Sequence, residues 1–193
     1  HTLDHVSYWW PGESLVFVGD TIFSLGCGRV IEGTHAMMWE SISRLRDLPD
    51  ETALYCGHEY TLANARFALM VDPDNPALKE RAAEVERLRA AGRPTLPTTI
   101  GREKRANPFL RADDPRVASA LGMPGDEPAQ VFAETIVSFL QPFERRLRPP
   151  PFREPGKLLA HRRHELLNGH GHPRAANEWR IPLLAIRLPR VLI

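Results

Sequence analysis

The run Ala53-Leu54-Tyr55-Cys56, followed directly by Gly57-His58-Glu59-Tyr60, is the most informative part of this chain. A short apolar run that ends at a glycine is typical of a buried strand, so this strand delivers His58 to the loop at its end. Upstream, Leu15-Val16-Phe17-Val18 is a second such run, and it ends at Gly19-Asp20. The sequence therefore places a histidine and a carboxylate after two predicted strands.

A third candidate, His1, stands in the block His1-Thr2-Leu3-Asp4-His5. Positions so far apart in the sequence converge only if each lies in a loop at one edge of a sheet, which the predicted strands allow. Imidazole and carboxylate are suitable ligands for borderline divalent metals. Taken singly, His1 is a frayed terminus and Asp20 an ordinary turn carboxylate. Taken together, His1, Asp20 and His58 predict a metal site built on strand ends.

The rest of the chain up to about residue 140 is predicted to be largely helical. Thr34 is a plausible N-cap for a helix that reaches Leu48, and Asn75-Pro76 opens a helix that stops at Gly92. Strands followed by helices indicate a sheet layer with a helical cap domain. The other expected elements are a strand at Val6–Trp10 and helices at 61–71, 100–106, 114–121 and 128–140.

Further blocks complete a family pattern: Phe17-Val18-Gly19-Asp20, Gly26-Cys27-Gly28-Arg29 and Asn107-Pro108-Phe109-Leu110-Arg111. In this order and spacing, from His1 to about Glu134, the chain closely resembles glyoxalase II, the hydroxyacylglutathione hydrolase of the metallo-β-lactamase superfamily. The resemblance implies an α/β (α+β) fold. Residues 1–60 would form part of a metallo-β-lactamase αββα sandwich, and residues 61–135 a helical substrate-binding domain.

The resemblance also implies a reaction, the hydrolysis of S-D-lactoylglutathione to glutathione and D-lactate, which removes methylglyoxal. The nucleophile would be a hydroxide that bridges two divalent ions, so no side chain is assigned a catalytic role. By resemblance His1 binds one ion, His58 binds the other and Asp20 bridges them. Zinc is the expected metal, with iron or manganese as alternatives. His5 is expected to pack beside the site instead of binding metal.

The substrate that the resemblance implies is anionic, so its pocket should offer a cation and aromatic hydroxyls. By resemblance Arg29 and Tyr60 are the substrate-binding residues. Ile31 stands where some family members have tyrosine. Arg111 is expected to form a structural ion pair near the cap.

The defining His-x-His-x-Asp-His motif of the family is not in this chain, and the first residue is His1 instead of methionine. Three of the family's seven protein ligands do not close a dinuclear site. We therefore expect that the first half of the catalytic domain precedes this segment, and that the chain alone is inactive.

The stretch 136–193 differs from the rest. It holds 11 basic and 4 acidic residues, whereas residues 1–135 hold 14 and 20. It also holds 8 of the 18 prolines, so we expect a disordered or weakly packed tail, although the last helix could continue as far as Pro149. A shifted reading frame or a genuine fused extension would each explain such a tail. Its run His170-Gly171-His172 lacks the Asp-His that would complete a metal motif.

Composition narrows the class of protein. The apolar fraction of 42% and charged fraction of 25% are those of a globular protein, and no apolar run approaches the roughly 18 residues that span a bilayer. Cys27 and Cys56 are interpreted as reduced thiols in the cytoplasm, with one bridge between them as the alternative. We expect a monomer that binds a small glutathione thioester and neither nucleic acid nor membrane.

Two rival functions remain open at this point. One is another glutathione-thiol enzyme of the same fold, such as an iron-dependent persulfide dioxygenase. The other is a catalytically dead fragment whose basic tail binds an acidic partner such as nucleic acid. The long helical segment with Asn107-Pro108-Phe109-Leu110-Arg111 favours glyoxalase II over the first rival, and salt-dependent nucleic-acid binding by residues 136–193 would identify the second.

Overall fold

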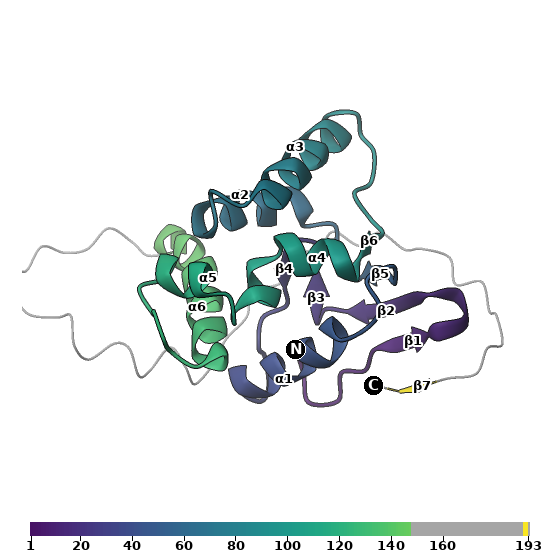
Figure 1. Ribbon diagram of the computed structural model, residues 1–193, viewed down its shortest axis with the longest axis horizontal. Coiled ribbons are helices and arrows are strands. Elements are labelled where there is room, and N and C mark those ends of the chain that lie inside the picture. Colours follow the sequence, from purple (N-terminus) through teal and green to yellow (C-terminus); the bar gives the residue numbers. More distant parts are fainter. Residues whose placement is uncertain (148–190, 193) are drawn as a thin grey trace, which may run out of the picture.

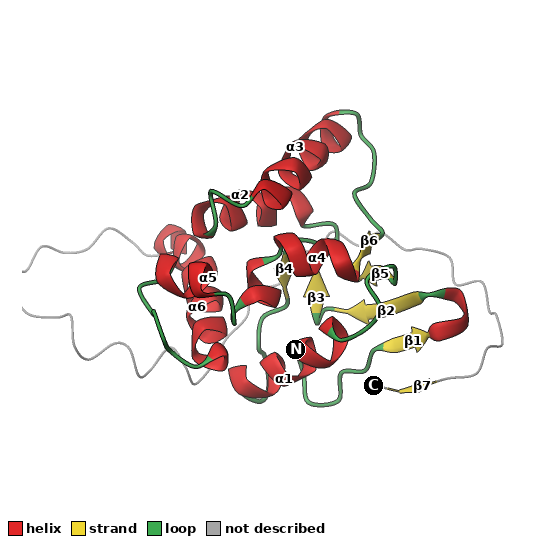
Figure 2. Ribbon diagram, in the orientation of Figure 1, coloured by secondary structure: helices red, strands yellow, loops and turns green. Residues whose placement is uncertain are grey.

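The computed structural model describes residues 1–147 and 191–192 of the chain. These residues form the mixed α/β fold that the sequence predicts, with a five-stranded sheet, a small two-stranded hairpin and six α-helices (Figures 1 and 2). The strands are β1 Tyr8–Trp10, β2 Leu15–Gly19, β3 Ile22–Phe23, β4 Gly26–Cys27, β5 Ala53–Cys56, β6 Thr98–Thr99 and β7 Val191–Leu192. The helices are α1 His35–Arg46, α2 Thr61–Val71, α3 Pro76–Ala90, α4 Ile100–Ala106, α5 Pro115–Ala120 and α6 Pro128–Leu147, with 3-10 turns η1 Pro11–Glu13 and η2 Pro108–Arg111.

The sheet has the strand order β6-β5-β2-β1-β7. Its central pair, β2 and β5, is parallel, and the chain crosses between them through α1. All the other neighbouring strands are antiparallel. Parallel strands end at the same edge of a sheet, so the residues after β2 and β5 meet. The amide of Gly57 accordingly donates to the carbonyl of Gly19 over 2.8 Å.

The predicted helix starts are confirmed by their caps. The Thr34 hydroxyl accepts a hydrogen bond from the Met37 amide at the start of α1. The Asn75 side chain accepts from the amides of Ala77 and Leu78, and Pro76 occupies the first position of α3, where a missing N–H costs nothing. Figure 1 shows α2 and α3 packed side by side above the β3–β4 hairpin.

Helix α6 ends at Leu147, so it extends beyond the predicted range of 128–140 but not past Pro149. Pro142 removes one amide donor from this helix but does not end it. The strand β7 pairs antiparallel with β1, with Tyr8 opposite Leu192. The rest of the predicted tail, including His170-Gly171-His172, lies outside the described residues.

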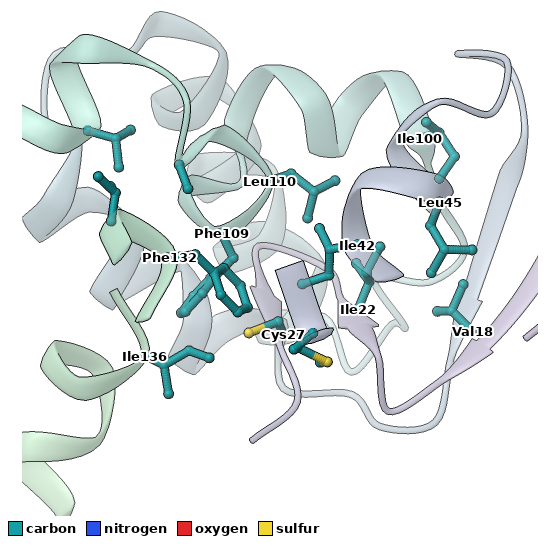
Figure 3. Close-up of a cluster of buried hydrophobic side chains, with 14 of the residues drawn as sticks. Val18, Ile22, Cys27, Ile42, Leu45, Ile100, Phe109, Leu110, Phe132 and Ile136 are labelled. Carbon is teal, nitrogen blue, oxygen red and sulfur yellow. The ribbon is translucent and has the colours of Figure 1, made fainter. Parts of the chain in front are cut away.

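One apolar core joins the sheet to the helices. Val16 and Val18 of β2 and Ile42 and Leu45 of α1 pack in the same cluster as Phe109 (Figure 3). Four aromatic rings pack together in this core, with Phe109 fully buried and the centroids of contacting rings 4.9–6.4 Å apart: Phe67, Phe109, Phe132 and Phe139. The core therefore draws on both of the predicted domains.

Arg111 forms the structural ion pairs that the sequence predicts. Its buried guanidinium binds Asp72, at the end of α2, and Asp114, the N-cap of α5. Asp114 also accepts from the Arg116 amide. Burial alone would raise the pKa of the Asp114 carboxyl, but hydrogen bonds from Arg116 and Arg111 outweigh it and lower that pKa.

The aromatic cluster yields a stability prediction. Phe109→Ala should lower the free energy of unfolding by about 3–5 kcal/mol, because it leaves a cavity among rings that cannot collapse onto it. Denaturant unfolding followed by circular dichroism measures the change. Met70→Ala is the matched control, since Met70 is 68% exposed and should change stability by less than about 0.5 kcal/mol. Equal losses in the two variants would contradict this account of the core.

Candidate metal and substrate site

The side chain of Asp20 lies between two imidazoles. Its Oδ2 atom is 3.7 Å from Nε2 of His1 and 3.4 Å from Nε2 of His58. Asp20 directly follows β2, and His58 lies two residues beyond β5. The structure therefore brings together the three residues that the sequence singled out as ligands, at the shared edge of the two parallel strands.

The second ring nitrogen of His1 is also engaged. Nδ1 lies 2.9 Å from the backbone carbonyl of Arg29, to which its N–H donates. Histidines that bind metal usually give their other N–H to a carbonyl or carboxylate, which fixes the tautomer. With Nδ1 protonated, a neutral His1 turns an unprotonated Nε2 toward Asp20. Two imidazoles and a carboxylate arranged in this way fit a borderline divalent ion.

Two glycines make room for Asp20. A Cβ atom on Gly57 would lie 2.5 Å from Oδ1 of Asp20, and one on Gly28 would lie 1.8 Å from its carbonyl oxygen. Neither position therefore accepts a side chain unless Asp20 moves. The sequence analysis did not assign these glycines a role. Their presence in the same blocks as His58 and Arg29 was the available signal.

His5 supports Asp20 from behind. The Asp20 amide donates to Nε2 of His5 over 3.2 Å, and the Thr21 hydroxyl lies 3.3 Å from Nδ1. Both ring nitrogens are thus engaged by Asp20 and Thr21, the two residues that follow β2. This agrees with the prediction that His5 packs beside the site.

His1 and His58 flank Asp20, one on each side of its carboxylate. Within residues 1–147 and 191–192, no group of three or more His, Cys, Asp or Glu side chains is arranged so that it could hold a metal ion by itself. The fit of His1, Asp20 and His58 to a metal thus rests on their donor chemistry and on the His1–Arg29 hydrogen bond.

The ring of Tyr60 stacks on the ring of His58, with centroids 4.9 Å apart and planes 14° apart. Phe23 meets both rings edge-on, at 5.9 Å from His58 and 5.4 Å from Tyr60. Tyr60 is 51% exposed, so it offers half of its surface to a ligand.

Arg29 joins the site through its backbone. Its carbonyl accepts from His1, while its side chain is exposed and forms no ion pair with any described residue. The structure shows no hydrogen bond or cation–π contact between Arg29 and Tyr60. Each of the two predicted substrate-binding residues thus contacts a candidate ligand, Arg29 through its carbonyl to His1 and Tyr60 through its ring on His58.

Glu59 anchors the loop that carries His58 and Tyr60. The sequence analysis did not predict this role. The Glu59 carboxylate accepts from the Thr95 amide at 2.8 Å, from the Thr95 hydroxyl at 2.5 Å and from the Thr61 hydroxyl at 2.8 Å. Partial burial alone would raise the pKa of the Glu59 carboxyl, but these hydrogen bonds outweigh it and lower the pKa. Its place between His58 and Tyr60 was the only sequence signal.

Both cysteines are free thiols, as predicted. Burial raises the pKa of the Cys56 thiol to about 11 and raises that of Cys27 further. A thiol with such a pKa is almost entirely protonated at neutral pH and is therefore a poor nucleophile. Neither cysteine is suited to attack a carbonyl.

Two protein-family models match the part of the chain that contains the candidate site. Residues 1–58 match the model of the metallo-β-lactamase superfamily, and residues 59–135 match that of the hydroxyacylglutathione hydrolase C-terminus. Residues 1–135 belong to the hydroxyacylglutathione hydrolase family of the metallo-β-lactamase superfamily. Membership of this superfamily implies the binding of divalent metal.

Similar proteins carry the name of the same family. The chain is 60% identical over 134 residues to a hydroxyacylglutathione hydrolase of Rhodopseudomonas palustris (strain BisB5). It is 62% identical, also over 134 residues, to those of Nitrobacter winogradskyi and of a Bradyrhizobium species. Each match covers 69% of this chain and 52% of the relative. The chain thus spans about half the length of the curated relatives it matches.

The close approach of Gly57 to Asp20 can be tested directly. Gly57→Ala should displace the Asp20 carboxylate, because the new Cβ would meet Oδ1 at 2.5 Å. A crystal structure of the variant should show a new Asp20 rotamer or a shifted 57–60 loop. Gly12→Ala is the control, since nothing lies within 4 Å of its added Cβ. An unmoved Asp20 in the Gly57 variant would contradict this explanation of the glycine.

The lowered pKa of Glu59 predicts a pH dependence of stability. Because the folded pKa lies below its ordinary value of 4.5, the ionised carboxylate contributes its full stability above that pH. The contribution is lost as the pH falls through the folded pKa. Glu59→Gln should therefore destabilise the chain near pH 7 and have a shrinking effect below about pH 4.5. Denaturant unfolding of both proteins from pH 7 to pH 3 measures the difference, and a constant difference would contradict the assignment.

Proposed function

We propose that residues 1–135 are part of a thioester hydrolase that converts S-D-lactoylglutathione and water into glutathione and D-lactate. The observation that carries the proposal is the meeting of His1 and His58 at Asp20, in a segment about 60% identical to proteins named hydroxyacylglutathione hydrolase. In the reaction the oxygen of water bonds to the acyl carbon, the carbon–sulfur bond breaks and the thiol sulfur gains a proton.

The candidate ligands divide between two ions in this proposal. His1 would hold one ion, His58 the other, and Asp20 both, with zinc as the first choice and iron or manganese as alternatives. When bound, such a pair supplies an activated water and polarises the thioester carbonyl. The chain's own part is to orient the ligands. His5 and Gly57 fix the position of Asp20, and the carbonyl of Arg29 fixes the ring of His1.

Glutathione binding falls to Tyr60 and Arg29 in the same proposal. The half-exposed ring of Tyr60 covers one face of His58, so a substrate held by its hydroxyl would lie beside that ligand. The Arg29 side chain, which pairs with no carboxylate in the described part of the chain, suits a glutathione carboxylate. We also propose that residues 1–193 alone turn over little substrate, because their described part supplies only three candidate ligands.

The remaining assignments are proposals as well. They are a division into residues 1–60, 61–135 and 136–193, a monomeric state and a reducing, cytoplasmic location suited to the free thiols Cys27 and Cys56. No helix in the described part of the chain is both long and apolar enough to cross a membrane. The match of residues 59–135 to the hydrolase C-terminus favours the hydrolase over a persulfide dioxygenase or a partner-binding fragment.

A chimera tests the function. Residues 1–134 of this chain replace the matching segment of the Rhodopseudomonas palustris relative, and the hybrid is assayed for hydrolysis of S-D-lactoylglutathione with metal supplied. We expect turnover within about tenfold of the parent enzyme. In the same hybrid, Asp20→Ala should lower metal content and turnover together, since Asp20 is assigned to both ions.

Glu13→Ala, at an exposed carboxylate in η1, is the matched control and should change neither quantity. An inactive hybrid that folds and binds two ions would remove the proposed function. Two bound ions in the Asp20 variant would remove the bridging role alone.

A further inference from the structure

Two segments close on the ring of His58. Tyr60, from the loop that also carries His58, stacks on one face, and Phe23, from the β3–β4 hairpin, meets it at an interplanar angle of 66°. The hairpin and the loop come from positions more than thirty residues apart. The orientation of the His58 imidazole toward Asp20 therefore depends on the distance between the loop of His58 and the β3–β4 hairpin.

The loop is tied through Glu59 to Thr95, in the connection between α3 and β6. Thr95 gives both its amide and its hydroxyl to the Glu59 carboxylate. The carbonyl of Thr95 in turn accepts from Nη2 of Arg81 at 2.8 Å. Arg81 thus reaches the loop of His58 through one intervening residue.

The hairpin is tied to the same guanidinium nitrogen. Nη2 of Arg81 lies 3.3 Å from the hydroxyl of Ser24, the residue directly after Phe23. That hydroxyl donates to the buried carboxylate of Glu103 at 3.1 Å. Asn107 completes the attachment by donating to the Phe23 carbonyl at 3.2 Å. Nη2 of Arg81 therefore binds both Ser24, in the hairpin, and Thr95, to which the loop of His58 is tied.

The burial of Arg81 is costly. The residue is only 5% exposed, its Nη1 pairs with Glu84 at 2.9 Å, and its Nε has no hydrogen-bond partner among the described residues. A buried donor without a partner destabilises a fold, and buried ion pairs can often be replaced by apolar residues at no loss of stability. Stability alone therefore does not explain a guanidinium at this position, whereas fixing the geometry of two segments does.

We propose that Arg81 is a positioning residue: its guanidinium sets the spacing between the loop of His58 and the hairpin of Phe23, and so directs His58 toward Asp20. The inference rests on the proposed function in treating His58 as a ligand. The spacing itself can be measured whether or not the chain has that function. Lysine is a poor replacement, because its ammonium rotates on a flexible stem, whereas the two N–H bonds of Nη2 are fixed in the guanidinium plane.

The test uses the 193-residue chain and the NMR signals of the His58 ring protons, which the rings of Tyr60 and Phe23 shift. All spectra are recorded at one pH, so that the variants are compared under the same conditions. We expect Arg81→Lys to move these signals, while Arg116→Lys, at an exposed ion pair, leaves them in place. Denaturant unfolding is measured on the same samples. Loss of stability with unmoved His58 signals would mean that Arg81 is merely structural, and would overturn the proposal.

Two milder variants decide the matter if the Arg81 variants do not fold. Ser24→Ala removes the contacts of the Ser24 hydroxyl with Arg81 and Glu103 and keeps the bond from Arg81 to the Thr95 carbonyl. Thr95→Val removes the contacts of the Thr95 hydroxyl with Glu59 and Thr61 and keeps the backbone bonds of Thr95. Each variant should move the His58 signals, but by less than the loss of the whole Arg81 guanidinium would. Unmoved signals in both variants would overturn the proposal. In an active chimera, Arg81→Lys should lower kcat about 10- to 100-fold with KM changed less than about twofold, as expected for a misplaced group. An inactive chimera counts against the proposed function and leaves the NMR result standing.

Discussion

The parallel pairing of β2 with β5 is the constraint on which the rest of the structure depends. It requires a crossover, which α1 provides, and it brings the residues after both strands to one edge of the sheet. The hydrogen bond from Gly57 to Gly19 continues the pairing beyond the strands themselves. Asp20 leaves no room for a side chain at either glycine, because its carboxylate lies against Gly57 and its backbone carbonyl lies against Gly28. The candidate site is thus a direct consequence of strand order.

Stability and geometry are served by different parts of the chain. The apolar cluster around Phe109 binds the helices to the sheet and supplies the bulk of the buried apolar surface. The buried polar groups add little net stability. Burial raises the pKa of Glu103 even though the Leu25 amide and the side chains of Thr98 and Asn107 donate to it. These groups instead fix the positions of backbone segments relative to one another, because each hydrogen bond joins two segments.

Much of this arrangement follows from local sequence. Short apolar runs ending at glycine predict β2 and β5, and Thr34 and Asn75-Pro76 predict the starts of α1 and α3, because those signals act within one turn of the chain. The same strand ends pointed to His1, Asp20 and His58. The contacts of Glu59 with Thr95 and of Arg81 with Ser24 could not be predicted in this way. Their partners lie 36 and 57 residues apart, and no local pattern specifies such pairs.

The boundary between the two family models, at His58 and Glu59, has a physical counterpart. His58 ends the superfamily segment and turns toward Asp20, whereas Glu59 begins the helical segment and turns toward Thr95. Adjacent side chains in an extended loop point to opposite sides, so one peptide bond connects the candidate ligands to the helical part. A change on α3 can therefore reach His58 without touching it, and the helical part contributes to the site as a support for the ligand loop. The loop of His58 loses its hydrogen bonds from Glu59 to Thr95 if this part is removed.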